Sequence, residues 1–159
     1  MNSMYAVDAY VRDYFRKAVL DALLAEKLPV TVFGEGWEKY SCGDEHSLRR
    51  EPAVPFALSF ERITKAHVLL NVSPIFNRGM HDRVPAGMAN HAVVLTDENP
   101  YLRRTFTDGK ELLFYSLEKP DTLCEQAERT LTDVRLREKI AASAYETFER
   151  EYTWKRRAE

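Results

Sequence analysis

Apolar runs without polar alternation recur along the chain, and longer stretches with helical spacing separate them. Such runs are typical of parallel strands that are buried on both faces. They occupy residues 30–33, 67–72, 92–96 and 112–115. A further short strand is expected within residues 52–56, where two prolines restrict it to the edge of a sheet.

Apolar residues at intervals of three and four predict helices between these strands. The predicted helices cover residues 7–26, 60–65, 100–106, 122–131 and 134–152, and residues 79–90 are expected to form a loop and a helix. Ser59 and Asp121 are the expected N-caps of two of them, Asn99 and Pro100 open a third, and Pro85 fits only the first turn of its helix. The polar residues 38–51 are expected to form a loop with at most one helical turn.

Strands that alternate with helices indicate an α/β protein, with a Rossmann-like parallel sheet and helices on both faces. The 159 residues fit a single domain. We divide it into a leading helix at 1–28, an α/β core at 29–132, and a C-terminal helix and tail at 133–159. The chain is too short for an enzyme that needs two such domains.

Charge and cysteine content narrow the function classes. The chain has 23 Lys and Arg against 25 Asp and Glu, a net charge of −2, so nucleic acid is not an expected partner, and the basic tail at 155–157 is expected to be solvated.

No apolar run reaches the roughly 18 residues of a membrane span. No histidine pair has ligand spacing, so no metal is expected. Two cysteines, Cys42 and Cys124, make no disulfide framework, which favours a cytoplasmic location.

Polar or glycine-rich residues follow three of the predicted strands. In open α/β sheets, ligands bind outside the carboxyl ends of the strands. These ends carry Gly34, Gly36 and Trp37, then Asn71 and Ser73, and finally Thr96 and Asp97. Glycine allows the backbone to approach a ligand closely, but it also serves to turn the chain, and both interpretations of the first loop remain open.

A cationic segment follows the second buried strand and leads into a helix. It contains Arg78, Gly79, His81, Asp82 and Arg83. Free N–H groups at a helix start, together with arginine, suit a phosphate or diphosphate group. Asp82 could cap the helix or hold Arg83 in place. A charged helix start that only faces solvent is the competing interpretation.

The order of these segments resembles the CgeB/YkvP-like glycosyltransferases, which are GT-B enzymes related to the group 1 (family 4) glycosyltransferases. The resemblance covers nearly all of the chain, and it depends on the order and spacing of degenerate motifs. The matching passages are 10–16, 30–37, 69–74, 79–84, 88–97, 106–115 and 152–158.

The resemblance implies the C-terminal half of a GT-B enzyme, which binds a nucleotide diphosphate sugar donor without a metal or other cofactor. It also implies that an N-terminal GT-B domain supplies most of the acceptor site, so the chain alone is expected to be inactive. The expected protein partner is such a domain or a further copy of the chain in a homo-oligomer. By position, the donor-site candidates are Gly34, Gly36, Trp37, Gly79, His81, Asp82 and Arg83, with Asn71, Ser73, Thr96 and Asp97 as weaker ones.

The sequence departs from the family pattern where group 1 relatives carry two glutamates. Arg78 and Ala86 stand at those positions, and His91 stands at that of the following glycine. The second glutamate usually holds the donor ribose. A non-catalytic interaction module, or a degenerate relative that has lost donor binding, is therefore the alternative hypothesis. A receiver-like signalling domain is disfavoured, because no acidic pair follows the first strand.

Overall fold

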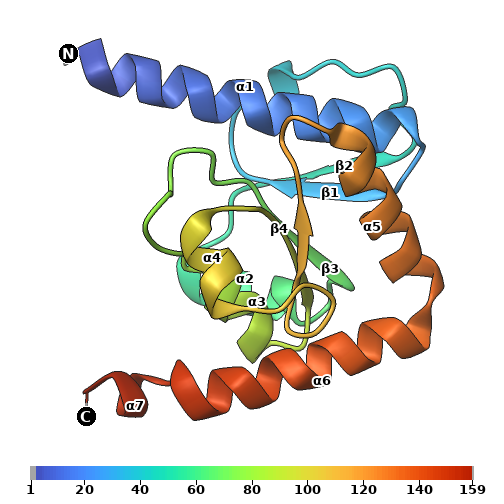
Figure 1. Cartoon of the computed structure of the whole chain (residues 1–159). Helices are drawn as coiled ribbons and strands as arrows, with labels where there is room; N and C mark the ends of the chain where they lie inside the picture. Colours follow the sequence, from blue (N-terminus) through green and yellow to red (C-terminus); the bar gives the residue numbers. More distant parts are fainter. Residues whose placement is uncertain (1–2, 159) are drawn as a thin grey trace.

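Helices surround five short parallel strands in the computed structural model, which describes residues 3–158 (Figure 1). The strands are β1 (Val30–Phe33), β2 (Leu48–Glu51), β3 (Val68–Asn71), β4 (Val93–Asp97) and β5 (Leu113–Tyr115). The α-helices are α1 (Ser3–Ala25), α2 (Phe56–Ile63), α3 (Arg83–Ala89), α4 (Pro100–Thr105), α5 (Pro120–Thr132), α6 (Val134–Glu151) and α7 (Trp154–Ala158), with a 3₁₀ turn at Trp37–Lys39.

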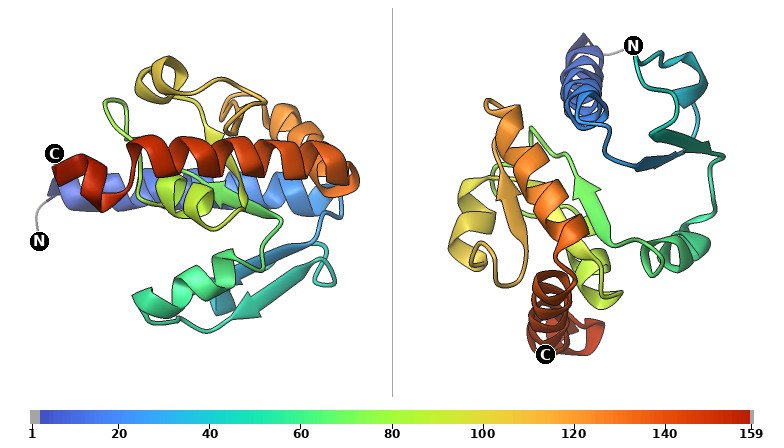
Figure 2. Two further views of the ribbon diagram at one scale, coloured as in Figure 1. Left: turned by 90° about the horizontal axis from the view of Figure 1, so that it is seen from below. Right: turned by 90° about the vertical axis from the view of Figure 1, so that its right-hand side faces the viewer.

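All strand pairs are parallel, as the predicted α/β class requires. The strands form two sheets, one of order β1-β2 and one of order β3-β4-β5. Val30 pairs with Leu48 in the first sheet, and Val68 pairs with Val93 in the second. Figure 2 shows β1 and β2 standing apart from the other three strands. The predicted fold class, parallel strands flanked by helices, is confirmed, and the structure divides these strands between two sheets.

The core lies on both faces of β4, whose residues are all buried. Val93 and Leu95 pack with residues of α1, α5 and α6 on one face, whereas Val94 packs with α3 and α4 on the other. This alternation follows from the period of two along a strand. The helices α3 and α6 pack against each other and support β4.

Three local predictions around residues 38–65 are wrong. The expected loop contains β2, whose only buried residue is Leu48, so it lacks the apolar pattern of a strand. The expected edge strand at 52–56 is absent, because α2 begins at Phe56, directly after Pro55. Ser59 lies inside α2, and its Oγ donates to the carbonyl of Phe56 at 2.6 Å.

The observed helix starts agree with the sequence-based expectations at some positions and differ from them at others. Asn99 and Pro100 begin α4 as predicted, and Asn99 is its N-cap, since its side chain accepts from the N–H of Leu102 at 2.8 Å. Asp121 is not an N-cap, because α5 begins one residue earlier at Pro120, with Lys119 at the cap position. Proline has a backbone angle that suits the first helical position. Pro85 lies in the first turn of α3, as expected. No helix among residues 3–158 is long and apolar enough to cross a membrane.

Candidate functional site

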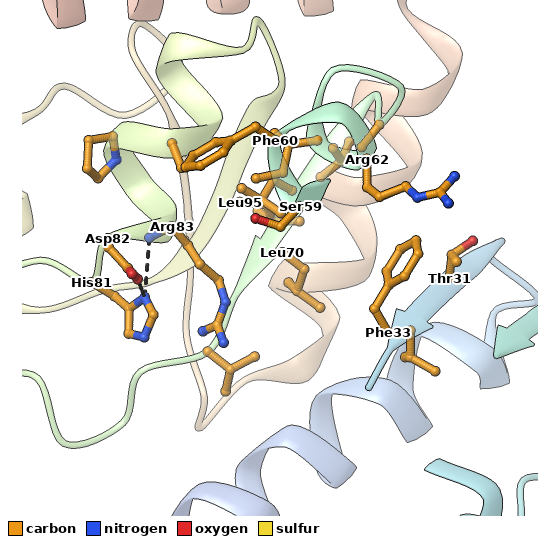
Figure 3. Close-up of a pocket in the computed structure, with 18 of the residues that line it drawn as sticks. Thr31, Phe33, Ser59, Phe60, Arg62, Leu70, His81, Asp82, Arg83 and Leu95 are labelled. Atoms are coloured by element: carbon orange, nitrogen blue, oxygen red, sulfur yellow. Dashed lines mark hydrogen bonds and ion pairs between the residues drawn. The ribbon is translucent and has the colours of Figure 1, made fainter. Parts of the chain in front are cut away.

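A cleft of about 1300 Å³ separates the two sheets, and the facing strands β1 and β3 form its opposite sides. Figure 3 shows Phe33 of β1 and Leu70 of β3 turned toward it. From β1 the chain continues to β2 on one side, and from β3 it continues to β4 on the other side. Such a reversal of direction is a topological switch point, where open α/β sheets bind ligands at the carboxyl ends of the strands.

Cationic side chains line this cleft almost without acidic neighbours. The lining includes Arg16 of α1, Arg78 and His81 of the loop after β3, and Arg83 at the start of α3, whereas Asp82 is its only acidic residue in the described part of the chain. In Figure 3, His81, Asp82 and Arg83 lie together beside β3. A net positive lining in a chain of net charge −2 marks a site for an anion.

The electrostatics of Arg83 show that this cluster is crowded with positive charge. Burial lowers the pKa of Arg83, and the nearby charge of Arg16 lowers it further. No ion pair to the Arg83 guanidinium occurs among residues 3–158, and Asp82 acts on it only through its charge. A bound anion would relieve the repulsion between Arg16 and Arg83.

His81 connects the loop to the first turn of α3. Its Nδ1 accepts a hydrogen bond from the backbone N–H of Arg83 at 3.2 Å, and the same nitrogen contacts the carboxylate of Asp82. Burial lowers the pKa of His81, and Arg83 adds to that effect. The neutral imidazole can keep the bond to Arg83, whereas the protonated ring must turn its Nδ1–H toward Asp82. His81 therefore couples the local charge to the geometry of the helix start.

The glycine loop after β1 has the backbone angles that require glycine. Gly34 and Gly36 have φ values of 120° and 92°, and added side chains there would meet no atom within 4 Å. The N–H of Gly36 donates to the carboxylate of Glu38 at 2.8 Å. Neither glycine lines the cleft, whereas Trp37 does and also packs against the cluster of Leu20, Leu24 and Leu48. The conformation thus accounts for both glycines as turn residues.

The weaker strand-end candidates form a buried network instead of a cleft surface. Asn71 donates to Thr96 Oγ1 at 3.0 Å, Ser73 Oγ donates to Asn71 Oδ1 at 3.2 Å, and the Ser73 N–H donates to Asp97 Oδ1 at 2.8 Å. The Tyr115 hydroxyl donates to the carbonyl of Asn71 at 2.9 Å. None of these side chains lines the cleft, so the network holds the ends of β3 and β4 together inside the domain.

Arg16 is a candidate that the sequence interpretation did not include. It lies in the middle of α1, far in sequence from the segment after β3, and it resembles the other charged residues of that helix. Only its placement beside Arg83 and His81 distinguishes it. Gly79, His81, Asp82 and Arg83 were predicted together, and all four line the cleft.

The buried carboxyl group of Asp97 predicts a pH-dependent stability. Burial raises its pKa from 3.8 to about 6, although hydrogen bonds from Ser73 and Thr96 oppose the shift. Between these pH values the folded state keeps a proton that the unfolded state releases, so stability falls as pH rises. The asparagine side chain of an Asp97→Asn variant cannot ionise, so the variant lacks this pH dependence. We expect the change in the free energy of unfolding caused by Asp97→Asn to be more favourable at pH 8 than at pH 4 by about 2–3 kcal/mol.

Urea unfolding at both pH values measures this difference. Glu149→Gln is the matched control, because Glu149 is exposed on α6 and forms no ion pair in the described part of the chain. An Asp97→Asn variant that changes stability equally at pH 4 and pH 8 would contradict the prediction.

The parallel sheets, flanking helices and strand-end cleft define an α/β domain that matches the C-terminal half of GT-B glycosyltransferases. The family assignment comes from the sequence: the profile of the glycosyl transferase-like family matches residues 12–159, so the chain belongs to that family. No curated protein matches the chain by sequence.

Solved structures of low identity share the fold. HepE from Anabaena, solved in complex with UDP-glucose, has 11% identity and a TM-score of 0.66, and the match covers 87% of this chain. A glycosyltransferase from Rickettsia africae has 9% identity and a TM-score of 0.70 over 87% of this chain. This chain spans 40% of the length of each.

A domain of similar size matches over most of its own length. The C-terminal domain of a group 1 family glycosyl transferase, LpcC from Francisella tularensis, has 12% identity and a TM-score of 0.53. The match covers 84% of this chain and 92% of that domain. These similarities show the fold, in agreement with the predicted fold class.

Proposed function

We propose that this chain is the nucleotide-sugar-binding domain of a CgeB/YkvP-like glycosyltransferase, and that it holds the donor diphosphate in the cationic end of the cleft. The observation that supports this proposal is the cluster of Arg16, His81 and Arg83 in the switch-point cleft, where Asp82 is the only acidic lining residue within the described part of the chain. HepE, which shares the fold, was solved with UDP and with UDP-glucose.

The chemistry of the cluster fits a diphosphate. Arginine presents parallel N–H donors that match two phosphate oxygens, and a partly buried guanidinium holds an anion more strongly than an exposed one. In glycosyl transfer, the bond between the sugar and the diphosphate breaks, and the leaving diphosphate gains negative charge. Fixed cations stabilise that charge without a metal ion. Arg83 and Arg16 are the groups that we assign to this task.

The other predicted residues take lesser parts in this proposal. Gly79 and Asp82 shape the loop before α3, and Trp37, which follows the glycine loop of Gly34 and Gly36, lines the cleft. We assign Asn71, Ser73, Thr96 and Asp97 to support of the strand ends. The acceptor site, and with it catalysis, belongs to a partner GT-B domain or to a second copy of the chain.

Calorimetric titration with UDP, GDP and their sugars tests the donor site. We expect Arg83→Ala to weaken binding by about 10- to 100-fold, because a hydrogen-bonded charge contributes roughly 1.5–3 kcal/mol. Arg104→Ala is the matched control, since Arg104 is exposed on α4 and does not line the cleft. Equal affinities for the parent and Arg83→Ala would contradict the assignment.

One observation favours the alternative function. Ala86, which stands where the family carries its ribose-binding glutamate, lines the cleft without a polar group. If the parent chain binds none of these nucleotides at millimolar concentration, the chain is a non-catalytic interaction module or a degenerate relative.

A further inference from the structure

The two strands that border the cleft each have one unpaired edge. Among the described residues, β1 pairs only with β2, and β3 pairs only with β4. The N–H groups of Val30 and Gly34 donate toward β2. Because successive residues of a strand point their backbone groups to opposite sides, Thr31 and Phe33 direct theirs toward the cleft.

The same alternation holds on the opposite side of the cleft. The carbonyl of His67 accepts from Val93 of β4 at 3.2 Å, so Val68 and Leu70 direct their N–H and C=O groups away from β4 and toward the cleft. Two parallel edges with unused donors and acceptors therefore face each other. Edges of this kind are templates for a further strand.

Helices cover the cleft on both faces. Leu20 and Leu23 of α1 and Leu131 of α5 line it on one face, where Leu23 belongs to the core cluster that contains Val93 and Leu95. Ile63 of α2 and Ala89 of α3 line it as well, and α2 packs against α3. A strand between β1 and β3 would be enclosed by apolar side chains above and below, which is the environment of an inner strand of a parallel sheet.

The burial of the bordering strands agrees with this geometry. Residues 68–70 of β3 are apolar yet only half-buried, whereas every residue of β4 is buried. Phe33 of β1 remains 39% exposed and faces the cleft. An additional strand would cover these side chains and join the two sheets.

We propose that the cleft receives one further parallel β-strand, supplied by polypeptide joined upstream of α1. The strand would pair with β1 on one side and with β3 on the other. The strands of the combined sheet then follow the order β2, β1, added strand, β3, β4 and β5. This is the Rossmann order 3-2-1-4-5-6, in which the added strand is strand 1. The added strand, α1 and β1 form a right-handed crossover unit, whose helix α1 already packs over the cleft.

An upstream source is favoured over a strand from another molecule for two reasons. The helix of a crossover unit joins neighbouring parallel strands, and α1 leads directly into β1. In addition, the chain spans only 40% of HepE, so a protein of the same fold carries more polypeptide than this sequence. The proposal is independent of donor binding.

The dimensions of α1 set the linker that such a strand requires. The helix has 23 residues and is therefore roughly 35 Å long, against about 13 Å for a four-residue strand. The linker must return about 20 Å from the start of α1 to the carboxyl end of the strand, which takes at least about six extended residues, so eight leave some slack. A test extension therefore consists of five β-branched residues followed by an eight-residue Gly/Ser linker, fused before Met1.

The full chain with this extension is compared with a control extension in which the second and fourth strand residues are proline. We expect the β-branched extension to raise Tm by about 5 °C or more. It should also slow amide hydrogen exchange at Thr31, Phe33, Val68 and Leu70 by at least about tenfold. The proline extension should do neither, because proline lacks the N–H and cannot pair with both edges.

Equal exchange at these amides in both extended proteins would overturn the proposal. Protection that appears only in dimers on size-exclusion chromatography would also overturn it, because the strand would then come from another molecule. Failure of this test leaves the Arg83→Ala titration unaffected, since that titration uses the chain without an extension.

Discussion

Ile140→Ala is expected to lower the free energy of unfolding by about 3–4 kcal/mol. Ile140 lies on α6 with no exposed surface and belongs to the cluster that joins Leu95, Leu113 and Leu123. Truncation removes three carbon atoms and leaves a cavity among side chains that are themselves fully buried. A domain of this size has a total stability of about 5–15 kcal/mol, so the loss would be a large fraction of it.

Urea or thermal unfolding measures the loss, and Val134→Ala provides a control on the same helix. Val134 is 48% exposed, so its truncation is expected to cost about 0.5 kcal/mol or less. If Ile140→Ala and Val134→Ala have similar effects, α6 does not pack on the sheet as described.

Gly87→Val is expected to lower stability by about 2–3 kcal/mol and to weaken nucleotide binding as well. A Cβ atom at Gly87 would lie 2.5 Å from Val94 Cγ2 and 3.0 Å from Leu69 Cδ2. Val94 is completely buried and cannot move aside easily. The helix α3 must therefore shift away from β3 and β4, and Arg83 at its first position moves with it.

Gly43→Val separates this effect from the general cost of placing valine at a glycine. A Cβ atom at Gly43 meets no atom within 4 Å, and Gly43 does not line the cleft. Unfolding and the titration with UDP are measured on both variants. A Gly87→Val protein with the stability and affinity of Gly43→Val would show that close packing of α3 on β3 and β4 does not position Arg83.

The sequence predicted most of the fold because long-range burial leaves a local pattern in apolar runs. The strands β1, β3, β4 and β5 carry such runs, and each lies within about two residues of its predicted bounds. The strand β2 could not be found in this way, because its charged residues Arg49 and Arg50 lie at a sheet edge. Its pairing with β1 is a tertiary contact that replaces the missing local signal.

Part of the candidate site could be predicted from the sequence, because its residues are close together in the chain. Gly79, His81, Asp82 and Arg83 are neighbours in the chain, and a helix start after a strand brings them to one place. Arg16 could not be predicted as a site residue, because its proximity to Arg83 depends on how α1 packs over the sheet. Asn71, Ser73 and Asp97 were expected at a ligand surface, but only tertiary packing shows that they bond to one another.

The amino-acid sequence by itself determined the α/β class, the parallel strands, most helices and the cationic segment after β3, since each depends on residues close in the chain. Tertiary structure alone decided that the strands form two sheets, that a cleft lies between the edges of β1 and β3, and that Arg16 joins Arg83 there. Sheet pairing and the packing of α1 join residues far apart in sequence, and no local pattern of apolar positions encodes such contacts.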